Sequence, residues 1–205
     1  MYKKYVKRGL DILFSFVLLV VLSPLFLLIM LLVRLDSKGS PFFRQERIGL
    51  NEKVFTLYKF RSMAVDSEHT GSGVYSDDHD PRVTRTGRIL RRLSLDELPQ
   101  CINIIKGDMS FIGPRPPLTY HPWPLSQYTP NQRKMFTVRP GITGWAQVNG
   151  RRSIDWNERI RLNNWYIEHL SFALDCKILW KTVEAVLSND NNANTGATIP
   201  PTPED

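Results

Sequence analysis

The chain has 205 residues, with 27 Lys and Arg against 20 Asp and Glu, which gives a formal net charge of +7. That length suits one compact domain with attachments, and an ordinary apolar content of 42% excludes a chain that is disordered throughout. The two cysteines, Cys101 and Cys176, form no C-x-x-C pair and no disulfide framework, so a reducing, cytoplasmic setting is expected.

An apolar run from Ile12 to Val33 argues against a purely soluble protein. Its 22 residues are all apolar except Ser15, Ser23 and Pro24, and runs of about 18 or more residues are typical of membrane segments. The run exceeds the roughly 7–15 residues of a signal-peptide core, and no small-x-small cleavage site follows it. We therefore expect a retained membrane segment.

Ser23 and Pro24 lie at the midpoint of this run and predict a kink. Proline has no amide hydrogen and pushes against the Val20 carbonyl, for which the Ser23 hydroxyl is the nearest substitute donor. Four Lys and Arg lie in residues 1–11 and five in residues 34–53, so both ends favour the cytoplasmic side. A re-entrant helix-break-helix meets that preference, and a kinked single span is the alternative.

Two strand-like runs follow, around Phe42–Gln45 and Val54–Phe60, and the turn residues Gly49-Leu50-Asn51 between them predict a β-hairpin. Residues 64–81 are polar and predict a loop. Arginines then recur at every third residue, interleaved with apolar residues. On a helix this spacing predicts a basic stripe beside an anionic membrane surface, formed by Arg82, Arg85, Arg88 and Arg91.

Ser94 to Lys106 is expected to form a helix that ends at Gly107. The Gly- and Pro-rich segments 107–117 and 137–151 are typical of ordered loops that line a site. Residues from Asp155 to about Leu187 predict two amphipathic helices with a break near Leu170-Ser171.

These elements predict an α+β fold, mainly helical, with a small β-hairpin or sheet. Residues 1–40 are expected to form the re-entrant membrane helix, kinked at Ser23-Pro24. Residues 41–187 are expected to form a cytoplasmic catalytic domain with interfacial amphipathic helices. Residues 188–205, poor in apolar side chains and rich in Asn, Thr and Pro, predict a disordered tail.

The run SLDELPQ, from Ser94 to Gln100, is the most informative stretch of the chain. Its structural interpretation is a capping box, with Ser94 and Glu97 at a helix start. With Ser94 as the N-cap, Pro99 costs a helical hydrogen bond, whereas a start nearer Asp96 would place Pro99 in the tolerated first turn. Its functional interpretation rests on Asp96 and Glu97. Adjacent carboxylates are too close to flank a glycosidic bond, but they can share a Mg²⁺ ion and divide the roles of nucleophile and proton acceptor in phosphoryl transfer.

Two other functional patterns are weaker. Asp78-His79-Asp80 matches the D-x-D of metal-dependent glycosyltransferases, but it lies in a Ser/Gly/Asp-rich segment without a strong strand before it, which favours a solvated loop. A metal cluster that includes His69 is less favoured still. The basic charge also suggests nucleic acid, but no nucleic-acid module is present, and phospholipid with phosphorylated substrates explains the charge more simply.

The run and its surroundings resemble the monotopic phosphoglycosyl transferases, a bacterial sugar transferase family, in their minimal catalytic-domain form. The resemblance covers about residues 3–187, including the anchor with its Ser-Pro break. It rests on four further motifs in the family's order, YKFRSM at 58–63, TRTGRILRRLSLDELPQ at 84–100, GDMSFIGPRP at 107–116 and RPGITGWAQVNGR at 139–151.

The resemblance implies an enzyme, a phosphotransferase that moves a sugar 1-phosphate from a UDP-sugar to polyprenol (undecaprenyl) phosphate and releases UMP. It implies Asp96 as the nucleophile and Glu97 as its partner, with Mg²⁺ held at this dyad. Basic positions near the phosphates correspond to Lys59, Arg115 and Arg151. It also implies a re-entrant helix in the bacterial inner membrane, with membrane lipids as partners, no nucleic acid, and an active site on the cytoplasmic face.

Two rival functions stay open at this point. A membrane-tethered binding or scaffold protein would show no Mg²⁺-dependent turnover. A glycosyltransferase that uses Asp78 and Asp80 would release a nucleoside diphosphate. The sequence leaves open the sugar, the base and the oligomeric state, a homo-oligomer included, and the variable stretch Pro116–Pro130 gives no further guide.

Overall fold

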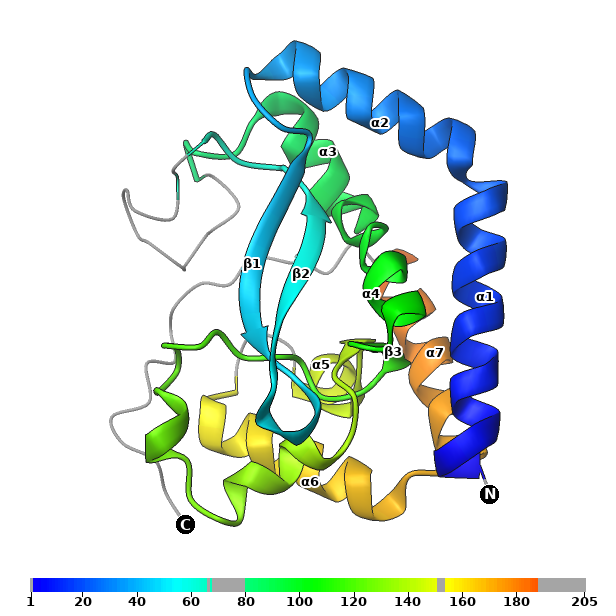
Figure 1. The fold of residues 1–205 in the computed structure, drawn as a ribbon, viewed down its shortest axis with the longest axis vertical. Helices are drawn as coiled ribbons and strands as arrows, with labels where there is room; N and C mark the ends of the chain where they lie inside the picture. The colour runs from blue at the N-terminus through cyan, green and yellow to red at the C-terminus, as the bar shows by residue number, and fades with distance from the viewer. Residues whose placement is uncertain (1, 66, 68–79, 151–153, 188–205) are drawn as a thin grey trace.

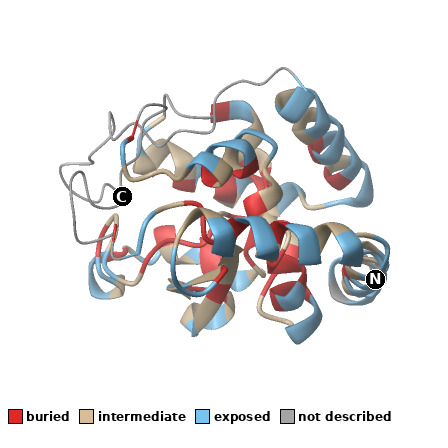
Figure 2. Cartoon of the chain, turned by 90° about the horizontal axis from the view of Figure 1, so that it is seen from above, coloured by how far each residue is buried: buried red, intermediate tan, exposed pale blue. Residues whose placement is uncertain are grey.

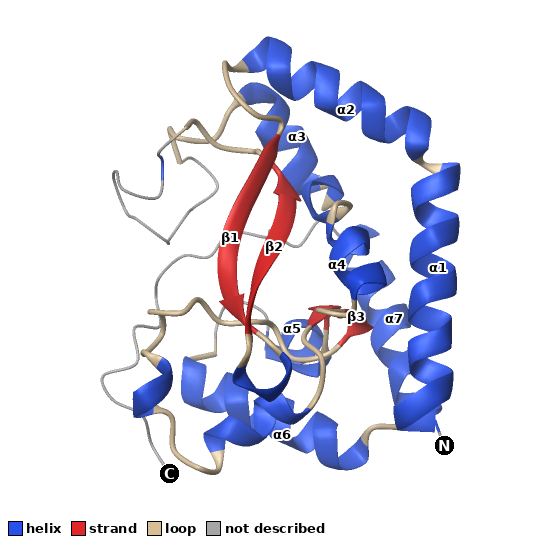
Figure 3. Cartoon of the chain, in the orientation of Figure 1, coloured by secondary structure: helices blue, strands red, loops and turns tan. Residues whose placement is uncertain are grey.

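The computed structural model describes residues 2–65, 67, 80–150 and 154–187, and it shows a mainly helical α+β domain beside a bent pair of helices (Figure 1, Figure 3). The expected fold class is confirmed. A short π-helical turn, Tyr2–Val6, leads into α1 (Lys7–Val21) and α2 (Ser23–Asp36), which run along one side and the top of the view in Figure 1. The tail at 188–205 lies outside the described residues.

The bend between α1 and α2 measures 66° and occurs at the predicted position. Ser23 Oγ donates a hydrogen bond of 2.8 Å to the Val20 carbonyl, which Pro24 leaves without its usual amide partner. The substitute donor expected from the sequence is therefore confirmed. Within the described ranges, no single helix is long and apolar enough to cross a bilayer, but α1 and α2 together meet that test of length and composition as a bent pair.

The predicted hairpin is present. Strands β1 (Phe42–Ile48) and β2 (Val54–Phe60) pair antiparallel, with Phe42 opposite Phe60 and Ile48 opposite Val54. A short 3₁₀ turn, Leu50–Glu52, connects them. Asn51 there has a φ of 53°, in the left-handed region that asparagine tolerates better than most residues, which explains its place in the turn.

The helix expected from Ser94 to Lys106 is wrong in its first half. Instead, α3 (Arg85–Arg92) is followed by a left-handed Ser94, with a φ of 54°. A 3₁₀ turn, Leu95–Glu97, then precedes α4 (Gln100–Lys106). Pro99 explains the division, because it has no amide to bond the Leu95 carbonyl. The Leu98 amide bonds that carbonyl at 3.2 Å instead. Ser94 makes no capping bond to the turn that follows, so the capping-box interpretation is also wrong.

The basic stripe on α3 is only partly as expected. Arg85 and Arg88 are exposed, in keeping with a solvent- or lipid-facing stripe. Arg82, by contrast, lies against Asp80, with 2.6 Å between its Nη2 and Asp80 Oδ2, and Arg91 Nε donates to Ser62 Oγ at 2.9 Å. Arg82 precedes the helix, and residues three apart within the helix drift around its axis, so a regular sequence spacing does not keep every side chain on the outer face.

The two Gly- and Pro-rich segments pack directly on each other. Each contributes a short strand, β3 (Ser110–Ile112) and β4 (Gly141–Thr143), and the two strands pair in parallel before the short helix α5 (Trp145–Gly150). A Cβ at Gly141 would lie 2.1 Å from the Gly113 amide nitrogen, so this approach of two backbones requires glycine. Short 3₁₀ helices at Leu125–Gln127 and Gln132–Thr137 lie between the two segments.

The C-terminal helices α6 (Trp156–His169) and α7 (Phe172–Leu187) have the predicted break between them. Buried clusters join the hairpin, α4 and these helices. Figure 2 shows the buried residues in the interior of the domain, whereas the helix at the label N is exposed over most of its surface. Exposed apolar side chains are also concentrated on α7, namely Phe172, Leu179, Trp180, Val183, Val186 and Leu187.

Candidate active site

Asp96 and Glu97 lie together in the 3₁₀ turn between α3 and α4, near the middle of the domain. The left-handed Ser94 turns the chain after α3, and Pro99 starts α4 three residues after Asp96. The two carboxylates are therefore held in a tight turn with a helix on either side. Their side chains are 13% and 22% exposed, so both are largely withdrawn from water but still reachable.

Lys59, near the end of β2, meets both carboxylates. Its Nζ lies 2.6 Å from Glu97 Oε1 and 3.9 Å from Asp96 Oδ2. Side chains alternate along a strand, so Lys59 shares the face of β2 that carries the buried Leu57 and points inward toward the turn. The structure thus brings together three of the residues expected to form the site.

The environment of Glu97 favours its ionised form. Burial alone would raise its pKa, but the Lys59 ammonium and the Arg115 guanidinium, with hydrogen bonds from Lys59 and Gln100, outweigh burial and lower the pKa of Glu97 below its ordinary value. Glu97 is therefore an anion that Lys59 already neutralises.

Asp96 has a different environment. Burial and the negative charge of Glu97 raise the pKa of Asp96 above its ordinary value, although Lys59 and Arg91 act in the opposite direction. Lys59 is 1.3 Å farther from Asp96 than from Glu97, by the difference between 3.9 and 2.6 Å. The carboxylate of Asp96 would consequently gain most from an additional cation.

A small, partly open hollow lies beside the dyad. Because the hollow is shallow and partly open to solvent, it would enclose only part of a larger ligand. Its polar lining comes from strands, turns and loops far apart in the sequence, namely Arg47, Lys59, Glu97, Gln100 and Arg115. Basic groups outnumber acidic ones in that set, which favours an anionic ligand.

Several residues of this site were missed from the sequence. Arg47 lines the hollow and donates from Nη1 to the Pro116 carbonyl at 3.0 Å, beside Arg115. Arg159, on α6, lies close enough to Arg115 that burial and the Arg115 charge lower its pKa to about 10. Isolated arginines in separate elements give no sequence signal. Gln100 could have been found, because it lies one helical turn after Glu97.

Other expected residues are not part of the described site. Arg151, Asp78, His69 and His79 lie outside the described residues. Asp80 is described and is buried, where it accepts hydrogen bonds from the Arg82 side chain and from the Arg82 amide at 2.9 Å. This contact gives Asp80 a clear structural role at the start of the chain leading into α3.

The two carboxylates of the dyad are the kind of oxygen donor that a magnesium ion shared with a ligand would use. Among the described residues, no group of three or more His, Cys, Asp or Glu side chains is placed to hold a metal ion by itself. Mg²⁺ in phosphoryl-transfer sites is commonly held by one or two carboxylates, with phosphates and waters completing its six positions. Asp96 and Glu97 could supply the carboxylates, and the raised pKa of Asp96 indicates a place where added positive charge is favourable.

Known proteins resemble this chain along nearly all of its length. A model of the family described as bacterial sugar transferase matches residues 2–189. The chain belongs to this family. It is also 43% identical over 189 residues to the sugar transferase EpsL of Bacillus subtilis, a match that covers 92% of this chain and 91% of EpsL. The family expected from the motifs is confirmed, and the chain is an enzyme of the transferase type.

Two longer relatives have more specific names. The chain is 41% identical over 187 residues to the UDP-N-acetylgalactosamine-undecaprenyl-phosphate N-acetylgalactosaminephosphotransferase of Aeromonas hydrophila, covering 90% of this chain and 44% of the relative. It is 40% identical over 185 residues to the UDP-glucose:undecaprenyl-phosphate glucose-1-phosphate transferase of Escherichia coli, covering 88% and 40%. The chain thus spans less than half the length of these two transferases.

Proposed function

We propose that this chain transfers a sugar 1-phosphate from a UDP-sugar to undecaprenyl phosphate and releases UMP. The observation that carries the proposal is the placement of Lys59 against the Asp96–Glu97 pair, beside a hollow with two further arginines. The names of the two longer relatives support the same reaction class and both substrates. Such a reaction would be an early membrane step in the synthesis of a glycoconjugate.

The basic side chains of the hollow suit the diphosphate of the donor. Arg115 and Arg47 would neutralise phosphate oxygens, and the planar guanidinium can hold two such oxygens at once. Lys59 would contact the phosphate next to the dyad. Because the hollow is small, the sugar and the base would extend beyond it, with Arg151 as a further candidate contact to the phosphates.

The two carboxylates would divide the chemistry. An Asp96 carboxylate oxygen attacks the sugar-bearing phosphorus, the bond from that phosphorus to the bridging oxygen breaks, and UMP leaves with the electron pair. A phosphate oxygen of undecaprenyl phosphate then attacks the same phosphorus. The bond to Asp96 breaks, the Asp96 carboxylate is restored, and Glu97 accepts the acceptor's proton if the monoanion binds.

Magnesium belongs to this proposal as the cofactor, with Asp96 and Glu97 as its protein ligands. When bound, it would neutralise charge on the donor's phosphates and on the departing oxygen. The remaining work falls to the protein. Lys59 keeps Glu97 ionised, and Arg115 and Arg47 orient the donor for attack by Asp96.

The bent helix pair would place this chemistry at a membrane. We propose that α1 and α2 form a re-entrant hairpin in the inner membrane, so that the active site faces the cytoplasm. The exposed apolar side chains of α1, α2 and α7 support contact with lipid. Tags before Tyr2 and after Asp205 should then both be protected in intact spheroplasts, and an N-terminal tag labelled only from outside would contradict the model.

The decisive experiment looks for the covalent intermediate. The enzyme is incubated with Mg²⁺ and a UDP-sugar labelled in its sugar, without lipid acceptor, then quenched and digested. UMP release stoichiometric with enzyme, and label on the Asp96 peptide, are expected. Wild-type enzyme that turns over with acceptor but releases no UMP without it would overturn the covalent mechanism.

Variants separate the two carboxylates. Asp96→Asn should abolish both half-reactions. Glu97→Gln should lose turnover but still form some covalent adduct, because Asp96 keeps its oxygen. Glu158→Gln, which alters a carboxylate on the outer face of α6, is the matched control and should retain wild-type turnover. An Asp96→Asn enzyme that still turns over would show that the nucleophile lies elsewhere.

The released nucleotide also tests the rivals. UDP in place of UMP would favour a glycosyltransferase that uses Asp78 and Asp80. Absence of Mg²⁺-dependent turnover with any UDP-sugar would favour a non-catalytic membrane scaffold. A screen of UDP-sugars with undecaprenyl phosphate therefore tests the function and identifies the sugar in the same assay.

A further inference from the structure

The buried side chain of Asn103 joins α4 to the edge of β2. Asn103 is 0% exposed, and its Oδ1 accepts a hydrogen bond of 3.0 Å from the Tyr58 amide. Its Nδ2 donates to the Thr56 carbonyl at 2.7 Å and to Asp108 Oδ2 at 3.3 Å. The partners fix the orientation of the amide, because a backbone amide must face the oxygen and a backbone carbonyl must face the nitrogen.

The pattern on β2 is that of a missing strand. In a parallel pair of strands, a residue on one strand bonds two backbone groups of the other strand, which flank the residue opposite it. These groups are the carbonyl of the preceding residue and the amide of the following one. Here Leu57 is the residue opposite, and the two groups are the Thr56 carbonyl and the Tyr58 amide. The carboxamide of Asn103 thus stands in for one peptide of a third strand. Leu57, between the two contacts, packs with Ile104 and Met109 in one buried cluster.

This junction lies between the two parts of the active site. Lys59 follows Tyr58 directly on β2, and Glu97 precedes α4, where Gln100 hydrogen bonds to Glu97. A small movement of α4 along β2 would carry Glu97 away from the Lys59 ammonium, now 2.6 Å distant. A displacement of about 1 Å in such a site can reduce turnover about 100-fold.

We propose that Asn103 is a positioning residue for the reaction, whose amide sets the register of α4 on β2 and thereby the place of Lys59 between Asp96 and Glu97. The inference rests on the proposed function. Asn103 touches none of the reacting atoms and acts through β2 and α4. Because Arg47 and Arg115 remain in place to bind the donor, the loss of Asn103 should lower kcat far more than it raises the donor KM.

Two substitutions test this in the full chain reconstituted in lipid nanodiscs. Asn103→Leu keeps a similar volume and removes every hydrogen bond of the amide. Asn103→Asp keeps an acceptor for the Tyr58 amide but sets a second oxygen against the Thr56 carbonyl. Both should lower kcat about 100-fold and change the donor KM by less than about three-fold.

Ile104→Ala is the matched control. Ile104 is equally buried on the same helix and packs on the same strand, but its side chain makes no hydrogen bond. It should lower the melting temperature as much as the Asn103 substitutions while keeping kcat within about three-fold of wild type. Equal losses of kcat in Asn103→Leu and Ile104→Ala at equal stability would overturn the inference.

A charge swap separates the strand contact from the contact with Asp108. In the double variant Asn103→Asp with Asp108→Asn, the bond between positions 103 and 108 can reform, but the Thr56 carbonyl still faces an oxygen. The double variant should therefore stay impaired. Recovery of near-wild-type kcat would assign the effect to Asp108 and contradict the strand model.

Hydrogen exchange of the Tyr58 amide tests the contact between α4 and β2 without an activity measurement. The Tyr58 amide should exchange at least about ten-fold faster in Asn103→Leu than in wild type, and change much less in Ile104→Ala. Equal exchange in all three proteins would overturn the inference by itself. If wild-type enzyme fails to turn over, the proposed function fails, while this measurement still decides whether Asn103 holds α4 to β2.

Discussion

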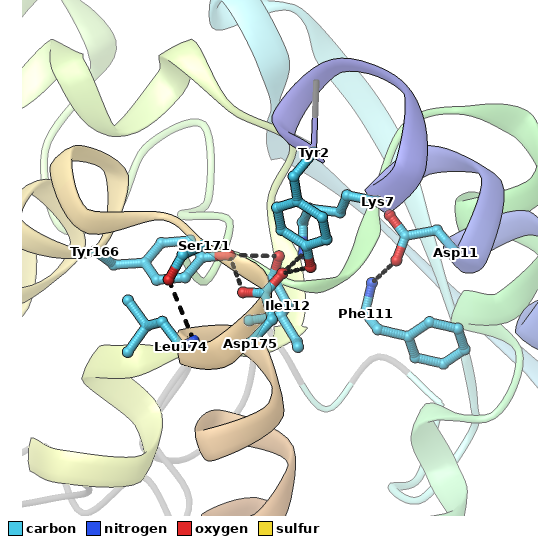
Figure 4. Close-up of polar contacts among 9 residues, drawn as sticks. All are labelled: Tyr2, Lys7, Asp11, Phe111, Ile112, Tyr166, Ser171, Leu174 and Asp175. Carbon is cyan, nitrogen blue, oxygen red and sulfur yellow. Dashed lines mark hydrogen bonds and ion pairs between the residues drawn. The ribbon is translucent and has the colours of Figure 1, made fainter.

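The two halves of the bent helix pair are held to the domain by different kinds of contact. The turn Tyr2–Val6 and the start of α1 use polar groups, with Lys7 Nζ 2.7 Å and the Tyr2 hydroxyl 2.5 Å from Asp175 Oδ2 on α7. Asp11 accepts a hydrogen bond of 3.2 Å from the Phe111 amide on β3 (Figure 4). Arg8 Nη1 also donates to the Ile104 carbonyl at the end of α4.

Helix α2 is held mainly by apolar packing. Ile29 and Val33 are each 2% exposed and pack with Phe60 of β2 and Leu90 of α3. Phe26 lies 4.6 Å from Phe60, measured between ring centroids. At the C-terminal end of α2, Asp36 makes a polar contact. Its Oδ2 accepts a hydrogen bond of 2.7 Å from the Thr86 amide in the first turn of α3.

This difference bears on how the proposed membrane helices can also belong to the domain that carries the dyad. The dyad lies between α3 and α4, and α2 holds the start of α3 while α1 holds the end of α4. Apolar packing gains little in lipid, where the surrounding tails are equally apolar, whereas polar contacts are directional. The polar start of α1 therefore fixes the orientation of the helix pair on the domain, and α2 adds close apolar packing against β2 and α3.

The largest effect should come from breaking the polar contacts of α1. Asp175→Ala leaves the Lys7 ammonium and two tyrosine hydroxyls, those of Tyr2 and Tyr166, without their carboxylate. The expected loss is about 3–5 kcal/mol of unfolding free energy, because removing one partner of a buried pair leaves the other uncompensated. Thermal unfolding in nanodiscs measures it. Glu158→Ala, in the exposed pair with Arg161, should lose far less, and similar losses would contradict the comparison.

Apolar contacts of α2 should come next. Ile29→Ala removes a buried side chain from the cluster with Phe60 and Leu90, which should cost about 2–3 kcal/mol. Leu28→Ala is the matched control, since Leu28 neighbours it on the same helix and is 51% exposed. The same unfolding assay should show little change in Leu28→Ala. A cost for Ile29→Ala above that of Asp175→Ala would reverse the proposed order of the two helices.

Sequence reasoning found the features that depend on local chemistry. The bend at Ser23-Pro24, the hairpin and the break before α7 all follow from residues next to one another, and the structure confirms each. The division of 94–106 was missed because two local signals conflict there. A capping pattern at Ser94 favours a helix start, and Pro99 prevents that helix from continuing.

Sequence reasoning predicted only those residues of the candidate site that lie in contiguous sequence motifs. Asp96 and Glu97 are adjacent in sequence, and the resemblance supplied Lys59 and Arg115. Three other side chains reach the site or its surroundings only through contacts between elements that are distant in sequence. They are Arg47 on β1, Arg159 on α6 and Asn103 on α4. Arg91 was expected on an outer face, but its partner Ser62 lies 29 residues away in sequence. Long-range contacts of this kind have no signature in one sequence.

A weaker link joins α2 to α3 through Asp36. Asp36→Ala removes the carboxylate that accepts from the Thr86 amide at the positive end of α3, which should cost about 1 kcal/mol of stability. Because α3 leads to the dyad, turnover should fall modestly as well. Arg34→Ala, an exposed substitution two residues earlier on α2, serves as the control in both assays. Unchanged stability in Asp36→Ala would show that apolar packing alone holds α2.

The smallest effect should come from the bend itself. Ser23→Ala removes the hydroxyl that bonds the Val20 carbonyl, but hydrogen bonds between groups in membranes contribute only about 0.6 kcal/mol on average. The bend should survive, because the docked ends of α1 and α2 hold it from outside. In the double variant with Pro24→Ala, a new amide can take the place of the hydroxyl, so the two substitutions should not be additive. Spin-label distances between Tyr5 and Leu35 should stay bent in Ser23→Ala. A straightened pair in that single variant would show that the Ser-Pro break, and not the contacts of the two helices, determines the angle.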